Sequence, residues 1–127
     1  MSTTTGSALV SINGHPLFVE IAGSGPPLIA LHGLGGATSL FPIASHFTRD
    51  QTVIRFDFEG AGHSPLTSAK LTMGGFVEDV KAVLEYAGFA EAKATIYGHS
   101  MGAAVSLILL PSWGRSVLRL LDPFRWP

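Results

Sequence analysis

The sequence predicts an α/β fold, with an N-terminal hairpin and a largely parallel sheet flanked by helices. Short apolar runs alternate with segments of helical periodicity, and this order is typical of parallel sheets. Glycine accounts for 15 of 127 residues, well above the average of about 7%. The glycines cluster where apolar runs end, as tight turns require. Hydrophobic residues make up 46% and charged residues 13%, a composition that excludes intrinsic disorder.

The predicted hairpin comes first in the chain. Residues 8–12 alternate between apolar and polar, as a half-buried strand does. The Asn-Gly pair at 13–14 is the strongest short signal for a two-residue hairpin turn. Residues 17–21 are the returning strand, and a loop rich in glycine and proline follows at 23–27.

Three short apolar runs predict strands that are buried on both faces. They cover residues 28–31, 52–56 and 94–97. The carboxyl ends of parallel strands meet at one edge of a sheet, and ligands bind there in open α/β folds. We therefore expect the three turns that follow the runs to converge on one site. These turns cover residues 32–36, 57–64 and 98–102.

Helical periodicity is clearest over residues 72–87. Thr72 can cap the start of this helix, and Gly88 can end it. A short helix is expected at 39–47. A buried helix is expected over 101–110, stopped by the proline that follows it.

Composition excludes several classes of function. The net charge is −1 and cysteine is absent, so we expect no nucleic-acid partner, disulfide or thiolate chemistry. No run of about 18 apolar residues predicts a membrane span. The N-terminus lacks the pattern of a secretory signal, so we expect a cytoplasmic protein. No histidine and carboxylate cluster has metal-ligand spacing, so we expect no metal, and the glycine-rich loop at 32–36 does not match a phosphate-binding loop.

Residues 98–102 read Gly-His-Ser-Met-Gly and match Gly-x-Ser-x-Gly. A buried strand before the motif and a helix after it favour a nucleophile elbow over an ordinary glycine-rich turn. In an elbow, Ser100 sits on a strained turn that leaves room only for small residues at 98 and 102. The turn lifts the hydroxyl clear of the sheet. It also directs the Met101 N–H, at a helix N-terminus, toward a developing oxyanion.

The other two turns have supporting roles in this interpretation. The loop that contains Gly33 can present a second N–H, from Leu34, to the same oxyanion. The turn at 57–64 is expected to be structural and to shape the floor of the pocket.

The three motifs together are His-Gly-x-Gly-Gly, Asp-x-x-Gly-x-Gly-x-Ser and Gly-His-Ser-Met-Gly. In order and spacing they resemble the N-terminal half of the α/β-hydrolase fold family, over about residues 8–110. The stretches that begin at Arg55 and Val77 are similar to fungal and bacterial 3-oxoadipate enol-lactonase-like members. The resemblance implies a truncated α/β-hydrolase fold with Ser100 as nucleophile and the N–H groups of Leu34 and Met101 as the oxyanion hole. It also implies an ester or lactone substrate and no cofactor.

The sequence departs from the family at the catalytic base. The family places an acid and then a histidine after the nucleophile. The residues after Ser100 contain a single acid, Asp122, and no histidine. Among the upstream histidines, His63 lies in a loop at the pocket edge and is the one candidate for a substitute base.

The remaining histidines have simpler interpretations. His32 and His99 lie inside turn motifs and are expected to hydrogen-bond the loop backbone. His15 and His46 are expected at the surface or in loops.

The tail at 111–127 leaves two interpretations open. It is either unrelated sequence in place of the rest of the domain, or it contains a remnant strand at 117–122. Function is open in the same way. One hypothesis is a serine hydrolase that lacks its catalytic histidine. The other is a catalytically inactive truncated fragment that self-associates, or binds a partner, through an uncovered sheet edge.

Overall fold

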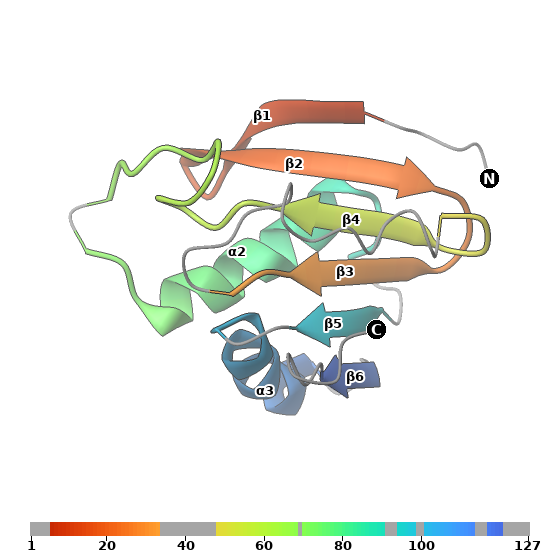
Figure 1. The fold of residues 1–127 in the computed structure, drawn as a ribbon. Coiled ribbons are helices and arrows are strands. Elements are labelled where there is room, and N and C mark those ends of the chain that lie inside the picture. The colour runs from red at the N-terminus through yellow and green to blue at the C-terminus, as the bar shows by residue number, and fades with distance from the viewer. Residues whose placement is uncertain are drawn as a thin grey trace.

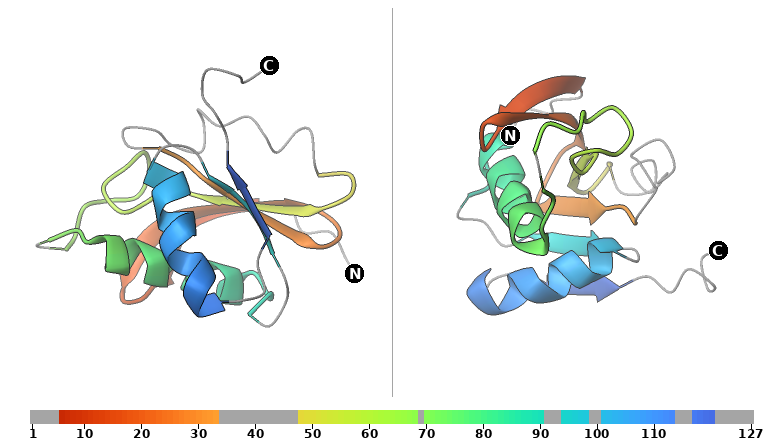
Figure 2. Two further views of the ribbon diagram at one scale, coloured as in Figure 1. Left: turned by 90° about the horizontal axis from the view of Figure 1, so that it is seen from below. Right: turned by 90° about the vertical axis from the view of Figure 1, so that its left-hand side faces the viewer.

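The computed structural model describes residues 6–33, 48–68, 70–90, 94–98, 101–113 and 117–120. These form a six-stranded sheet in the order β1-β2-β4-β3-β5-β6 (Figure 1). The strands are β1 (Gly6–Ile12), β2 (His15–Gly23), β3 (Pro27–Leu31), β4 (Thr52–Phe56), β5 (Thr95–Gly98) and β6 (Val117–Leu120). The helices are α2 (Met73–Tyr86) and α3 (Met101–Trp113), and both lie on one face of the sheet (Figure 2).

The hairpin forms where the sequence predicts it. Strands β1 and β2 pair antiparallel, with Ile12 opposite His15 across a two-residue turn. Asn13 has φ 51° and Gly14 has φ 83°. A tight turn of type I′ needs positive φ at both central residues, which explains the Asn-Gly pair. Both strands extend a few residues beyond the predicted ranges of 8–12 and 17–21.

The parallel part of the sheet contains the three predicted strands, but β5 lies one residue later than predicted and alternates between half-buried and buried residues. Strand β3 lies at its centre, parallel to β4 on one side and to β5 on the other. Every residue of β3 is buried, as a strand with neighbours on both sides and covered faces requires. Strand β2 runs antiparallel to β4. The β1–β2 turn therefore lies at the same end of the sheet as the carboxyl ends of the parallel strands (Figure 1).

Helix α2 covers the sheet with its apolar side, and its buried side chains include Phe76, Val80 and Leu84. Thr72 caps the helix, because its hydroxyl oxygen accepts the Gly75 N–H at 3.0 Å. The helix ends at Tyr86 with Ala87 as its C-cap, and Gly88 follows with φ 93°. Both ends were expected from the sequence.

Helix α3 differs from its predicted end at residue 110. It continues through Pro111 to Trp113. A proline removes the hydrogen bond of its own nitrogen, but the residues after it can still complete the final turn. The segment after this helix contains β6, which pairs parallel to β5. The division into a domain at 8–110 and a tail at 111–127 stays a prediction.

Some expectations fall outside the described residues. These are the helix at 39–47, the residues His46, His99 and Asp122, and the two site residues Leu34 and Ser100. Within the described part of the chain, no helix is both long and apolar enough to cross a membrane.

Candidate active site

The predicted elbow begins at the end of β5 and finishes at the start of α3. Leu31, the last residue of β3, pairs with Gly98, the last residue of β5. The loop that begins at His32 and the turn that follows Gly98 therefore leave the sheet side by side. Met101 is the first residue of α3, so its N–H belongs to the unpaired N-terminal turn that favours negative charge.

Glycine is required at both flanks of the motif. A Cβ added to Gly98 would lie 2.8 Å from the backbone nitrogen of Ala103. A Cβ added to Gly102 would lie 2.2 Å from the carbonyl oxygen of Leu31. Backbone atoms cannot move aside as a flexible side chain can, so the first turn of α3 packs directly against the end of β3. This is the steric arrangement that an elbow needs.

His32 is fixed by two backbone groups, as predicted. Its Nε2 accepts the N–H of Phe58 at 3.0 Å, and its Nδ1 lies 2.7 Å from the carbonyl oxygen of Gly33. A backbone N–H can only donate and a carbonyl can only accept, so the proton is on Nδ1. Both ring nitrogens are thereby used. His32 joins the loop after β3 to the turn after β4, and it has no nitrogen left to act as a base.

The turn at 57–64 is held by its own hydrogen bonds. The Asp57 carboxylate accepts the N–H of His63 at 2.9 Å. Ser64 donates its hydroxyl to the Asp57 carbonyl at 2.6 Å and accepts the Phe18 N–H at 2.8 Å. These bonds tie the turn to β2, in agreement with the structural role expected for it.

His63 lies on the outside of this turn, with 65% of its side chain exposed. Its Nδ1 is 3.5 Å from the buried carboxylate of Asp57, and its ring centroid is 4.7 Å from that of Phe18. A carboxylate beside one ring nitrogen is the arrangement that orients a histidine base. Its role as a base stays a prediction, as do the roles of Ser100, Leu34 and Asp122.

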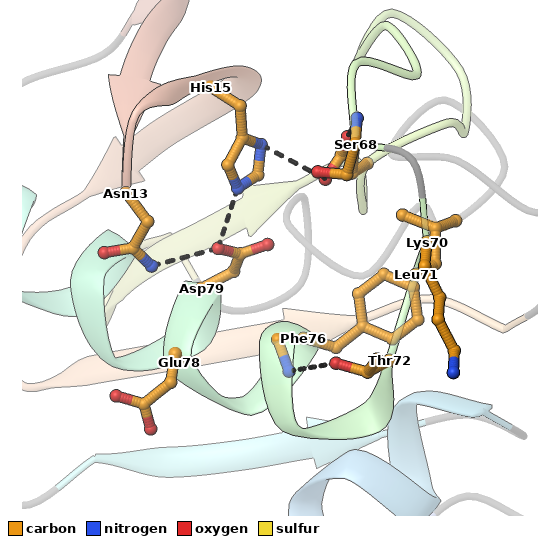
Figure 3. Close-up of a pocket in the computed structure, with 11 residues that line it drawn as sticks. Asn13, His15, Ser68, Lys70, Leu71, Thr72, Phe76, Glu78 and Asp79 are labelled. Carbon is orange, nitrogen blue, oxygen red and sulfur yellow. Dashed lines mark hydrogen bonds and ion pairs between the residues drawn. The ribbon is translucent and has the colours of Figure 1, made fainter.

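A second polar cluster, which the sequence analysis missed, lies under the β1–β2 turn (Figure 3). His15 was expected at the surface or in a loop, but only 13% of its side chain is exposed. Its Nε2 lies 3.1 Å from Oδ1 of Asp79, and its Nδ1 lies 3.5 Å from Oε1 of Glu59. Asn13 donates to the same Asp79 oxygen at 3.0 Å. The expectation was wrong because the turn folds over the start of α2.

Burial acts to raise the pKa of both carboxylates in this cluster, but the resulting shifts have opposite directions. Burial acts to raise the pKa of Glu59, but hydrogen bonds from Thr67 and Ser68 outweigh it and hold that pKa at about 2, against an ordinary 4.5. For Asp79 burial prevails and raises the pKa, although Asn13 and His15 partly offset it.

A cavity of about 360 Å³ opens beside this cluster. It is lined by the hairpin turn, the loop between β4 and α2, and the first half of α2 (Figure 3). Of the described residues of the motif, Gly98, Met101 and Gly102 do not line it. Among the described residues, no group of three or more histidine and acidic side chains could hold a metal ion.

Comparison with known proteins gives matches of two kinds. An uncharacterised protein of Mycobacterium tuberculosis is 27% identical over 112 residues, which is 87% of this chain and 32% of its own length. A Haemophilus influenzae protein that is provisionally named an esterase/lipase is 35% identical over 83 residues, which is 65% of this chain and 28% of its own. The chain thus spans about a third of the length of these curated relatives.

Solved structures share the fold over nearly the whole chain. The epoxide hydrolase CorEH superposes with a TM-score of 0.84 at 25% identity, covering 94% of this chain and 42% of its own. Est816, an N-acyl homoserine lactone degrading enzyme, superposes with a TM-score of 0.81 at 22% identity, covering 90% and 44%. The family model of the alpha/beta hydrolase fold matches residues 26–117. This match covers well over half of the sequence, and the chain belongs to the α/β-hydrolase fold family.

Proposed function

We propose that the chain carries the nucleophile and oxyanion half of a serine hydrolase site for esters or lactones. The observation that carries this proposal is the close approach of Gly102 to the Leu31 carbonyl oxygen, which would lie only 2.2 Å from a Cβ at residue 102. Such an approach between a helix start and a neighbouring strand end is what an elbow requires. The esterase/lipase name of one relative and the lactone substrate of Est816 support the substrate class.

In the proposed reaction, the hydroxyl oxygen of Ser100 attacks the carbonyl carbon of the substrate. The carbonyl oxygen becomes negative, and the N–H groups of Leu34 and Met101 stabilise it. The leaving alcohol departs and leaves an acyl group on the serine, which water then removes. Each step needs a base to take a proton from the serine hydroxyl or from water.

The base is the weak part of this site. No histidine follows Ser100 in these 127 residues, and both nitrogens of His32 are occupied. A serine without a base stays close to its ordinary, very high pKa and is a poor nucleophile. We therefore propose that a polypeptide of these residues alone turns over esters slowly or not at all.

A second candidate function is association with another protein surface. Leu107 and Ile108 lie next to each other on α3, with exposed fractions of 53% and 49%. Adjacent apolar side chains with this exposure favour burial against a partner or a second copy. Among the strands that the structure describes, β6 is the last in the sheet order, and its outer edge has no described strand beside it, so it is available for pairing with a partner.

A fluorophosphonate probe separates the two candidates. Labelling of the wild type but not of Ser100→Ala would show that Ser100 is activated although no histidine follows it. Ser11→Ala, which changes an exposed serine of β1, is the matched control and should leave labelling intact. Absence of wild-type labelling, together with a sedimentation coefficient above that of a monomer, would favour association over catalysis.

A further inference from the structure

Gly98, Met101 and Gly102 do not line the cavity beside His15, Glu59 and Asp79, and the proposed hydrolase site gives this cavity no role. It places a nearly buried carboxylate beside an apolar wall. Asp79 is 4% exposed as a residue, and Phe76 is 9% exposed. Leu71, at the rim, is 41% exposed. The volume of about 360 Å³ suits a small organic molecule.

One oxygen of Asp79 is left for a ligand. Its Oδ1 accepts one hydrogen bond from Asn13 and lies 3.1 Å from Nε2 of His15. In the described part of the chain, no donor reaches Oδ2, and Figure 3 shows this oxygen turned toward the side on which Phe76 lies. A carboxylate can accept about four hydrogen bonds, so the acceptor capacity that faces the cavity is unused.

The charge of the lining selects the sign of the ligand. The cavity is lined by three carboxylates, Glu59, Glu78 and Asp79, together with Lys70 and His15. When His15 is neutral, the lining therefore carries two more negative than positive charges. Glu59 is already satisfied by Thr67 and Ser68, whereas burial raises the pKa of Asp79. The ionised form of Asp79 is therefore incompletely compensated, and a cation would compensate it.

We propose that this cavity binds a small primary amine that carries an apolar group. The ammonium donates to Oδ2 of Asp79, and the apolar group lies against Phe76 and Leu71. A neutral molecule of the same shape would gain the apolar contact alone. An anion would meet the carboxylates and be excluded.

The test is an NMR titration of the ¹⁵N-labelled 127-residue chain with 2-phenylethylammonium chloride, using 2-phenylethanol as the uncharged analogue. We expect saturable shifts in the amides of the hairpin turn and the first half of α2. The affinity for the alcohol should be at least tenfold lower. Asp79→Asn should weaken amine binding at least tenfold and bring it close to alcohol binding.

A pair of arginine variants keeps the test decisive if Asp79→Asn does not fold. Leu71→Arg places a cation at the rim and should weaken amine binding at least tenfold. Leu66→Arg is the matched control, because Leu66 is 64% exposed and does not line the cavity. Equal binding of amine and alcohol, no saturable shift, or equal weakening by both arginine variants would each overturn the proposal.

Discussion

Glu59 offers a stability change whose size and sign both follow from the structure. Its carboxylate is 4% exposed and accepts the N–H groups of Thr67 at 2.9 Å and Ser68 at 2.6 Å. The hydroxyls of the same two residues donate to it at 3.1 Å and 2.9 Å. Burial opposes ionisation, but these bonds hold the pKa at about 2, below the ordinary 4.5.

The magnitude follows from the difference between the folded and unfolded pKa. Each pKa unit is worth about 1.36 kcal/mol, so a fall from 4.5 to about 2 corresponds to at most about 3 kcal/mol, which solvent screening reduces for a carboxylate that lines an open cavity. The folded pKa lies below the unfolded one, so this stabilisation is fully present above pH 4.5. It is lost as the pH falls through the range down to about 2. Asp79 has the opposite effect on stability. Because its pKa is raised in the folded state, its ionisation destabilises the fold as the pH rises.

The perturbation that isolates this contribution is Glu59→Gln. Urea unfolding, followed by circular dichroism between pH 7 and pH 2, gives the free energy of unfolding for both proteins. We expect the free energy of unfolding of the wild type to exceed that of the variant by about 1–3 kcal/mol at pH 7, and this difference should shrink as the pH falls below 4.5. Glu78→Gln is the control, because it changes a carboxylate of the same cavity that is 65% exposed. Its free energy of unfolding should fall below pH 4.5 as that of the wild type does. A difference between wild type and Glu59→Gln that stays constant from pH 5 to pH 2 would refute the reasoning.

Three further predictions concern the elbow and the histidines. Gly102→Val should lower the free energy of unfolding by more than about 3 kcal/mol, because its side chain would clash with backbone. The control Gly74→Ala, in open space within α2, should raise it by about 0.5–1 kcal/mol. A wild-type melting temperature for Gly102→Val would contradict the elbow. The purified chain should not turn over p-nitrophenyl esters, and turnover that disappears in both Ser100→Ala and His63→Ala would establish His63 as the base instead. The ¹⁵N spectrum of His32 should show the proton on Nδ1 at neutral pH, and a spectrum with the proton on Nε2 would disprove the assigned hydrogen bonds.

The sequence predicts features that depend on local pattern. The strand at 52–56 is found at its predicted bounds, because a short apolar run between turns has few alternatives. The backbone bonds of His32 were also expected, because a histidine inside a tight loop lies among backbone groups. The contact between His15 and Asp79 joins residues 64 positions apart, and it depends on how the hairpin folds over α2. The one local signal was the helical spacing of Asp79 from Phe76, which places Asp79 on the buried side of the helix.

The same distinction between local patterns and distant contacts applies to the residues of the candidate site. Gly98 and Gly102 could be predicted because a Gly-x-Ser-x-Gly string between strand and helix has one common steric cause. The base could not, since a catalytic histidine comes from a distant part of the chain that no local pattern identifies.

The contact between Gly102 and the Leu31 carbonyl also bears on how this motif is used to recognise hydrolases. The packing of α3 on β3 requires glycine at 102 whether or not the serine reacts. A protein of this fold that lost its catalytic base would still unfold, or fold differently, if this glycine changed. The flanking glycines therefore report that the architecture is kept, whereas the chemistry requires Ser100 together with a base. A screen that scores the whole motif as evidence of activity would count inactive members of the fold as enzymes.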